Sequence, residues 1–209
     1  MPFADLDAVT VDGYGTLLEL PDPAGALVEA LAAAGMTRSR EEVAAAFAAE
    51  VGHYRPRAHR GRDPESLAAL RLECVAVFLG ALDAELDPQT FVEAFIGSLA
   101  FSPVPGVVET LERLAARTRL AVVANWDSSL HEQLDRLGLD RYFDAVVTSA
   151  EAGAAKPDPK IFLAALRRLD VEPARALHVG DEPIDEQGAR AARMRFLPAP
   201  LATAFADLS

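Results

Sequence analysis

The chain has 209 residues, enough for one large domain or two small ones, and its 51% hydrophobic and 25% charged residues are the balance of a folded globular protein. Its net charge of −12 argues against nucleic acid or an anionic membrane surface as the main partner, because both attract a basic face. No apolar run reaches the roughly 20 residues that span a bilayer, and residues 1–7 lack the form of a signal peptide. The single cysteine, Cys74, cannot form an internal disulfide. We therefore expect a cytoplasmic protein.

The first predicted element is a strand, over residues 5–11, which runs into the glycine-rich turn Asp12-Gly13-Tyr14-Gly15-Thr16. Four helices follow. Each begins at an Asp or Ser whose side chain can accept a hydrogen bond from a free amide of the first turn, and in three of them a proline comes next, where no donor is needed. These helices are predicted near residues 22–34, 39–54, 63–82 and 87–100.

From residue 103 onward, strands and helices alternate. Helices are predicted at 106–117, 128–137, 158–169 and 184–193, and strands at 120–124, 145–148, 176–179 and 195–197. This alternation is typical of βαβ units in a parallel sheet. The sequence therefore predicts a doubly wound, Rossmann-like α/β core made of residues 1–17 and 103–209, with an all-helical domain inserted at residues 18–102.

Polar side chains follow four of the predicted strands, and sites in open parallel sheets form beyond the carboxyl ends of the strands. These side chains belong to Asp12, Tyr14 and Thr16, then Asn125, Trp126 and Asp127, then Lys156, and finally Asp181, Glu182 and Asp185. Crowded carboxylates repel one another unless a cation lies among them. A lysine together with a hard divalent metal would satisfy this group, and oxygen ligands favour Mg²⁺.

Four segments carry a resemblance to a known family. They are Val11-Asp12-Gly13-Tyr14-Gly15-Thr16-Leu17, Val122-Val123-Ala124-Asn125, Lys156-Pro157-Asp158-Pro159 and His178-Val179-Gly180-Asp181-Glu182-Pro183-Ile184-Asp185. In their order, their positions at strand ends and the helical insertion after the first of them, they resemble the haloacid dehalogenase superfamily of hydrolases and phosphotransferases. The resemblance covers the whole chain. It implies that the helical insertion is a mobile cap that excludes water and selects a small anionic substrate.

The resemblance also implies roles for the residues at the strand ends. Asp12 would be the nucleophile that forms a covalent aspartyl intermediate, and Lys156 would neutralise charge between it and the substrate. Backbone amides of the turns that carry Thr16 and Asn125 would bind the transferred oxygens.

A magnesium site is implied beside the nucleophile. The carboxylates of Asp12 and Asp181 and the backbone carbonyl of Tyr14 would hold Mg²⁺, and Asp185 would orient that shell or its waters. The implied metal-site residues are thus Asp12, Tyr14, Asp181 and Asp185.

Two positions depart from the pattern of the family's phosphatases. Tyr14 stands where they place a second aspartate, the acid and base of the reaction, and Ala124 stands where they place a Ser or Thr that binds the phosphoryl oxygen. The Asp-x-Tyr-Gly-Thr form resembles the 2-haloacid dehalogenases, which need no metal. The fourth segment, with Asp181 and Asp185, keeps the metal-binding form, and we give it more weight because an unneeded carboxylate in such a cluster is costly.

Three hypotheses follow. The first is Mg²⁺-dependent hydrolysis of a small phosphorylated substrate, with Asp12, Lys156 and Tyr14 as the catalytic residues. The second is a metal-independent 2-haloacid dehalogenase. The third is a protein of this fold with little catalysis that binds an anionic ligand or partner.

Other conspicuous residues are assigned structural roles. Trp126 is expected to pack against the insertion, Asp127 to be the N-cap of the next helix, and His178 and Cys74 to lie in the core. The basic segment at residues 53–62 is expected to be solvated surface, with anion binding as the alternative.

Overall fold

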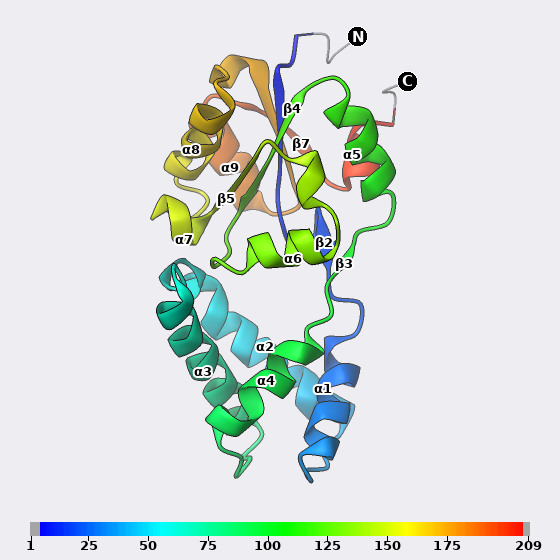
Figure 1. Cartoon of the computed structure of the whole chain (residues 1–209), viewed down its shortest axis with the longest axis vertical. Coiled ribbons are helices and arrows are strands. Elements are labelled where there is room, and N and C mark those ends of the chain that lie inside the picture. The colour runs from blue at the N-terminus through cyan, green and yellow to red at the C-terminus, as the bar shows by residue number, and fades with distance from the viewer. Residues whose placement is uncertain (1–4, 207–209) are drawn as a thin grey trace. The chain divides into compact units, whose positions relative to one another are not determined.

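The computed structural model describes residues 5–206 (Figure 1). The chain divides into two compact units. One consists of the described residues up to Glu19 together with those from Pro103 onward, and the other is Leu20–Ser102. Within residues 5–206, none of the helices combines the length and the apolar character needed to cross a membrane.

The first unit is built on a five-stranded parallel sheet in the order β5-β4-β1-β6-β7. The strands are β1 (Ala8–Val11), β4 (Arg119–Ala124), β5 (Ala145–Thr148), β6 (Ala176–Gly180) and β7 (Arg195–Pro198). Helices α8 and α9 lie on one face of this sheet and α5 on the other (Figure 1). The predicted doubly wound α/β fold is confirmed.

The helices of this unit vary in length. They are α5 (Val107–Ala115), α6 (Leu130–Arg136), α7 (Ser149–Ala152), α8 (Pro159–Leu169), α9 (Pro183–Ala191) and α10 (Leu201–Ala204), with 3-10 turns at Asp140–Tyr142 and Pro173–Arg175. Two of them were not predicted, α7 and α10, because four residues are too few to show a helical period.

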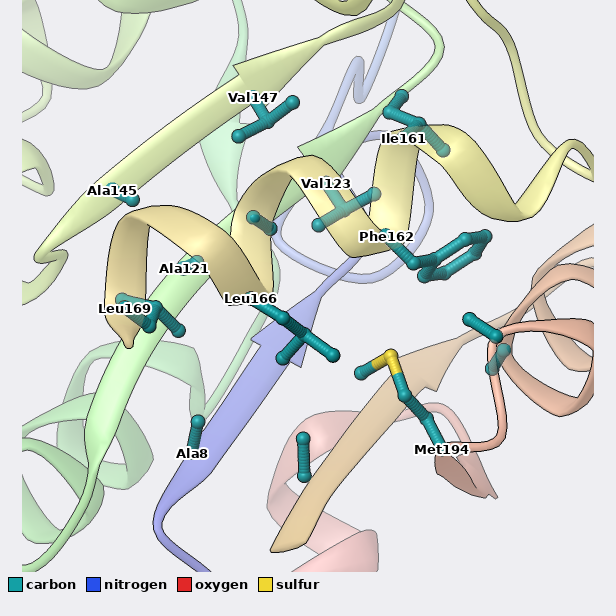
Figure 2. Packing of buried hydrophobic residues seen from close by; sticks show 14 residues of the cluster. Ala8, Ala121, Val123, Ala145, Val147, Ile161, Phe162, Leu166, Leu169 and Met194 are labelled. Atoms are coloured by element: carbon teal, nitrogen blue, oxygen red, sulfur yellow. The ribbon is translucent and has the colours of Figure 1, made fainter. Parts of the chain in front are cut away.

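The core of this unit lies between α8 and the sheet. Figure 2 shows the buried side chains of α8, among them Ile161, Phe162 and Leu166, on the face of the sheet that carries Val123 and Val147. Helix α9 packs closely against α8, since a Cβ built on Gly188 would lie 2.3 Å from the Phe162 ring. The cluster covers the face of β1 that carries Ala8, and all four residues of β1 are buried. The carboxyl end of β1 therefore lies at the edge of a buried strand.

The second unit is all-helical. It contains α1 (Pro23–Ala33), α2 (Arg40–Tyr54), α3 (Pro64–Ala81) and α4 (Pro88–Ser98). The four predicted caps are present: the side chains of Asp22, Ser39, Asp63 and Asp87 each accept a hydrogen bond from a backbone amide of the first turn. Phe78 packs between Phe91 and Phe95 in the core of the unit.

Two short strands mark the places where the chain passes from one unit to the other. Strands β2 (Leu18–Glu19) and β3 (Ser102–Pro103) pair as a two-stranded sheet. The sequence does not predict them, because two residues are too few to show the alternation of a strand.

The basic segment at residues 53–62 contains a 3-10 turn, Arg55–Arg60. Several of its charges are already engaged: Arg60 makes two hydrogen bonds to Glu73, and Arg57 donates to the carbonyl of His53. Anion binding by this segment stays a prediction. Cys74 is buried, as predicted.

One carboxylate is buried in the helical unit. Glu50 of α2 is 6% exposed, and the thiol of Cys74 on α3 hydrogen-bonds to it. Burial raises the pKa of Glu50 from 4.5 to about 7, and the Cys74 thiol offsets only part of this rise.

Replacing Glu50 by Gln is expected to raise the free energy of unfolding, more at pH 8 than at pH 5. The carboxyl of the unfolded chain ionises near pH 4.5, whereas in the fold it keeps its proton up to about pH 7, so the native state loses stability as the pH rises through this window. The penalty that Gln removes is about 3 kcal/mol at pH 8 and less than about 1 kcal/mol at pH 5. Urea unfolding at both pH values measures it.

The matched control is Glu93→Gln, an exposed position on α4, which should change unfolding little at either pH. An equal effect of Glu50→Gln at pH 5 and pH 8 would contradict the expectation.

Candidate active site

Asp12 lies directly after β1, in a turn held by backbone hydrogen bonds. Its amide donates to the carbonyl of Val179 at 2.9 Å, and the carbonyl of Gly13 accepts from the amides of Leu17 and Leu18. Gly15 has a φ of +90°, and a Cβ there would lie 2.4 Å from Oδ2 of Asp181. Glycine is therefore required at residue 15 if this turn is to approach Asp181 so closely.

Lys156 reaches Asp12 from the segment after β5. Its side chain is 2% exposed, and Nζ donates to Oδ1 of Asp12 and, at 2.6 Å, to Oδ1 of Asp185. The side chain of Asn125 holds the Lys156 backbone at two points: Nδ2 donates to its carbonyl at 3.1 Å, and Oδ1 accepts from its amide at 2.7 Å. The lysine is thus fixed both at its backbone and at its charge.

Three carboxylates meet at this end of the sheet. Asp12, Asp181 and Asp185 each offer an oxygen, and these oxygens all lie within 4.8 Å of one another. Asp12 and Asp185 are buried, whereas Asp181 is exposed. A set of carboxylate oxygens at this spacing fits a hard divalent cation such as Mg²⁺.

The surrounding hydrogen bonds distinguish the three carboxylates. Oδ1 of Asp181 accepts from the Thr16 hydroxyl at 3.0 Å. Oδ2 of Asp185 accepts from the Glu182 amide at 3.0 Å, and its Oδ1 is already shared by Lys156 and His178. Because both oxygens of Asp185 have protein donors, this residue is better suited to hold the water shell of a cation than to bind it directly.

The charges at the site are strongly coupled. Burial raises the pKa of Asp12 to about 7, although the charge of Lys156 opposes this rise. Burial by itself lowers the pKa of Lys156, but Asp12 and Asp185 outweigh it and raise the pKa overall. For Asp185, burial is outweighed by the hydrogen bond from His178 and the charge of Lys156, which lower its pKa. A divalent cation would favour the ionised form of Asp12 further.

The fold brings Asp12, Lys156, Asp181 and Asp185 together, as the strand-end argument predicts, and their roles stay predictions. Thr16 is 0% exposed and its hydroxyl is directed at Asp181, so only its backbone is left for the predicted contact with substrate.

The other predicted site residues are placed as follows. Asn125 clamps Lys156, and its predicted contact with substrate stays a prediction. Tyr14 is 54% exposed, the one large hydrophobic side chain in residues 5–206 that is so accessible. Its roles as a catalytic residue and as a carbonyl ligand of a metal also stay predictions.

The predicted role of Asp127 as the N-cap of the next helix is wrong. Helix α6 begins at Leu130, its N-cap is Ser129, and a turn separates it from β4. Asp127 instead accepts a hydrogen bond from the Ser129 amide at 2.8 Å within that turn. Trp126 is 7% exposed, and its ring packs against Gly13, where an added Cβ would lie 3.3 Å from it. The ring therefore supports the turn that carries Asp12.

His178 lies in the core, as predicted, and is 0% exposed, but it also contacts Asp185. Residues beyond the strand ends do not include it, because it lies within β6, two residues before the end of that strand. Strand alternation is the signal that could reveal it: Thr10 and Asp12 point to the same face of the sheet, and a polar residue inside the neighbouring strand can face them.

The chain is similar in sequence to a protein family and to individual proteins. A family model for haloacid dehalogenase-like hydrolases matches residues 6–193. The chain is 44% identical over 121 residues to the haloacid dehalogenase-like hydrolase domain-containing protein 3 of Mus musculus, a segment that covers 55% of this chain and 48% of that protein. It is 42% identical over 100 residues to the glyceraldehyde 3-phosphate phosphatase of Methanopyrus kandleri, covering 44% of this chain and 41% of that protein. The chain thus spans less than half the length of both relatives.

Solved structures show the same fold. The HAD-hydrolase YfnB of Bacillus subtilis, bound to magnesium, superposes with a TM-score of 0.75 at 16% identity and covers 98% of this chain and 99% of that one. The 2-haloacid dehalogenase of Pseudomonas syringae pv. Tomato DC3000 superposes with a TM-score of 0.63 at 29% identity, over 91% of this chain and 85% of that one. Similar proteins therefore include both a phosphatase and a dehalogenase.

Proposed function

We propose that this chain, which belongs to the haloacid dehalogenase-like hydrolases, hydrolyses small phosphate esters with Mg²⁺ through an aspartyl-phosphate at Asp12. The observation that carries the proposal is the group of three carboxylates, Asp12, Asp181 and Asp185, whose oxygens lie within 4.8 Å of one another. A halide leaves without protonation, and its displacement needs no cation. In a metal-free dehalogenase Asp181 would therefore only repel the neighbouring carboxylates, Asp12 and Asp185.

In the first step Asp12 is the nucleophile and Lys156 supplies positive charge. Lys156 engages Oδ1 of Asp12, and we assign the attack on phosphorus to Oδ2. A bond from Oδ2 to phosphorus forms as the bond from phosphorus to the leaving oxygen breaks, and the leaving oxygen takes a proton from solvent. Lys156 offsets the negative charge that Asp12 and the phosphoryl group bring together.

Water completes the reaction. It attacks phosphorus, the bond from phosphorus to Asp12 breaks, and inorganic phosphate leaves with the carboxylate regenerated. Asp12 and Asp181 would hold Mg²⁺ with the Tyr14 carbonyl, and Asp185 would hold its waters. When bound, the cation supplies positive charge that lets an anionic nucleophile approach an anionic substrate.

A second candidate function, 2-haloacid dehalogenase, is favoured by Tyr14 and by the 29% identity to the Pseudomonas dehalogenase. Asp12 would displace the halide and form an ester that water hydrolyses. A panel of phosphate esters and 2-haloacids, each with Mg²⁺ and with a chelator, separates the two. Turnover of phosphate esters that the chelator abolishes supports the proposal, whereas chelator-resistant turnover of haloacids supports the alternative. No turnover of either class supports a protein that only binds an anion.

Mg²⁺ is expected to stabilise the native state, because a ligand that binds only the native state adds to its stability. At a concentration about 100 times its dissociation constant the gain is about 2.7 kcal/mol, which raises the melting temperature by roughly 5–10 °C for a chain of this length. Asp181→Ala should abolish this shift. Thermal unfolding with and without Mg²⁺ measures both effects.

Asp170→Ala serves as the control, because Asp170 is an exposed carboxylate at the end of α8 and outside the group of three. It should keep the full shift. A wild-type melting temperature that millimolar Mg²⁺ leaves unchanged would count against the phosphohydrolase and in favour of the dehalogenase.

A further inference from the structure

A line of hydrogen-bonded side chains leads from the interior of the sheet to Asp12. The Thr10 hydroxyl lies 2.8 Å from Nδ1 of His178, and Nε2 of His178 lies 3.2 Å from Oδ1 of Asp185. The same Asp185 oxygen accepts from Nζ of Lys156, which also donates to Asp12. Thr10 and His178 are 0% exposed and Asp185 is 1% exposed, so water does not compete for these bonds.

Strand pairing sets the inner end of this line. Thr10 of β1 and His178 of β6 are register partners in adjacent parallel strands. Asp12 follows Thr10 by two residues and so points to the same face of the sheet. The rings of Phe162 and Phe196 lie 4.9 and 6.4 Å from the imidazole, centre to centre, and fix its plane by packing.

The partners of the two ring nitrogens set the direction of each hydrogen bond. Nε2 faces the Asp185 carboxylate, and a carboxylate oxygen accepts, so Nε2–H is the donor of that contact. Nδ1 faces the Thr10 hydroxyl, which can donate to it in the Nε2–H tautomer.

We propose that His178 is a positioning residue: its Nε2–H holds the Asp185 carboxylate, and Asp185 thereby holds the Lys156 ammonium beside Asp12, while Thr10 keeps the imidazole in the required tautomer. The inference rests on the proposed function, because it takes Asp12 as the reacting carboxylate.

An apolar side chain would fill the same space in the strand without supplying a donor. The Asp185 carboxylate would then keep only Lys156 and the Glu182 amide as donors, and would be free to turn toward the lysine. Partners of this kind, one step removed from the reacting groups, are typically worth 10–100-fold in activity or metal affinity.

The matched pair of variants is His178→Asn and His178→Gln. The amide nitrogen of Gln lies about as far along the side chain as Nε2, whereas that of Asn corresponds to Nδ1. His178→Asn is expected to lower kcat on an aryl phosphate by about 10–100-fold with little change in KM. His178→Gln should restore most of kcat, because it keeps a donor for Asp185.

The composition allows a second measurement that needs no substrate. The chain has two lysines, Lys156, which is buried, and Lys160, which is exposed. Labelling lysine with ¹⁵N therefore yields two side-chain ammonium signals, and Lys160→Arg assigns them. Proton exchange at the Lys156 ammonium is expected to become at least about tenfold faster in His178→Asn, because a hydrogen bond to a charged group is lost, and to stay near the wild-type rate in His178→Gln.

Leu177→Ala is the control for lost packing. Leu177 is the neighbouring residue of β6, is 3% exposed and points to the opposite face of the sheet. It should lower the melting temperature without changing kcat of the folded protein or exchange at Lys156. Equal kcat and equal exchange in the Asn and Gln variants would overturn the proposal and leave His178 as packing.

Two further results keep the test decisive. If the wild type turns over no phosphate ester, the proposed function fails, and the exchange rates alone still support or overturn the positioning role. If His178→Asn does not fold, Thr10→Val replaces it, because Val has the shape of Thr without the hydroxyl. Faster exchange at Lys156 in Thr10→Val, restored in Thr10→Ser, supports the proposal, and unchanged exchange in folded Thr10→Val overturns it.

Discussion

Asp12→Asn is expected to abolish turnover, with a loss on the order of 10⁴-fold or more, as for removal of other enzymatic nucleophiles. A carboxamide has almost the shape of the carboxylate but is a far weaker nucleophile. An amide oxygen can still accept the hydrogen bond from Lys156, so the variant is expected to keep the fold. The loss is therefore chemical and not structural. Initial rates on the best phosphate ester, compared with the wild type at equal folded concentration, measure it.

Two controls accompany this variant. Mass spectrometry excludes deamidation of the introduced amide back to aspartate, which would restore activity slowly. Asp127→Asn alters a second buried carboxylate beyond a strand end, one whose oxygen accepts from the Ser129 amide. It should retain turnover because an amide oxygen also accepts that bond. If the Asp12→Asn variant turns over substrate at the wild-type rate without deamidation, both the phosphohydrolase and the dehalogenase hypothesis are wrong.

Tyr14→Asp is expected to raise the rate on alkyl phosphates by about 10²-fold or more, and to raise that on aryl phosphates much less. An alkoxide is a poor leaving group unless an acid protonates it, whereas an aryl oxide leaves unaided. A tyrosine hydroxyl is a poor general base for the attacking water. Because Tyr14 is 54% exposed, an aspartate there stays solvated and can act as the missing acid and base.

The same substitution has the opposite effect on a dehalogenase. A second carboxylate beside Asp12 raises the pKa of the nucleophile and repels a carboxylate substrate, so dehalogenation falls. Tyr14→Asp and Tyr14→Asn are both to be assayed with the two substrate classes. The Asn side chain has nearly the shape of Asp but no carboxyl group. A gain confined to the aspartate variant identifies acid–base chemistry. If neither class changes, residue 14 takes no part in catalysis.

Local patterns were sufficient for the order of the longer helices and strands and for the carboxylates and the lysine of the site. Asp22, Ser39, Asp63 and Asp87 predicted the helix starts of the second unit, because capping involves neighbours in sequence. The residues after each strand were predictable as a group, because all strands of a parallel sheet end at the same edge.

The use of each side chain depended on the tertiary structure. The side chain of Asn125 holds the backbone of Lys156, 31 positions away. The hydroxyl of Thr16 donates to Asp181, 165 positions away. The bond between Thr10 and His178 spans 168 positions and exists because β1 pairs with β6 in one register. A shift of that register by one residue would turn one of the two side chains to the other face of the sheet. Register is decided by packing across the whole core, and local sequence patterns carry no record of it.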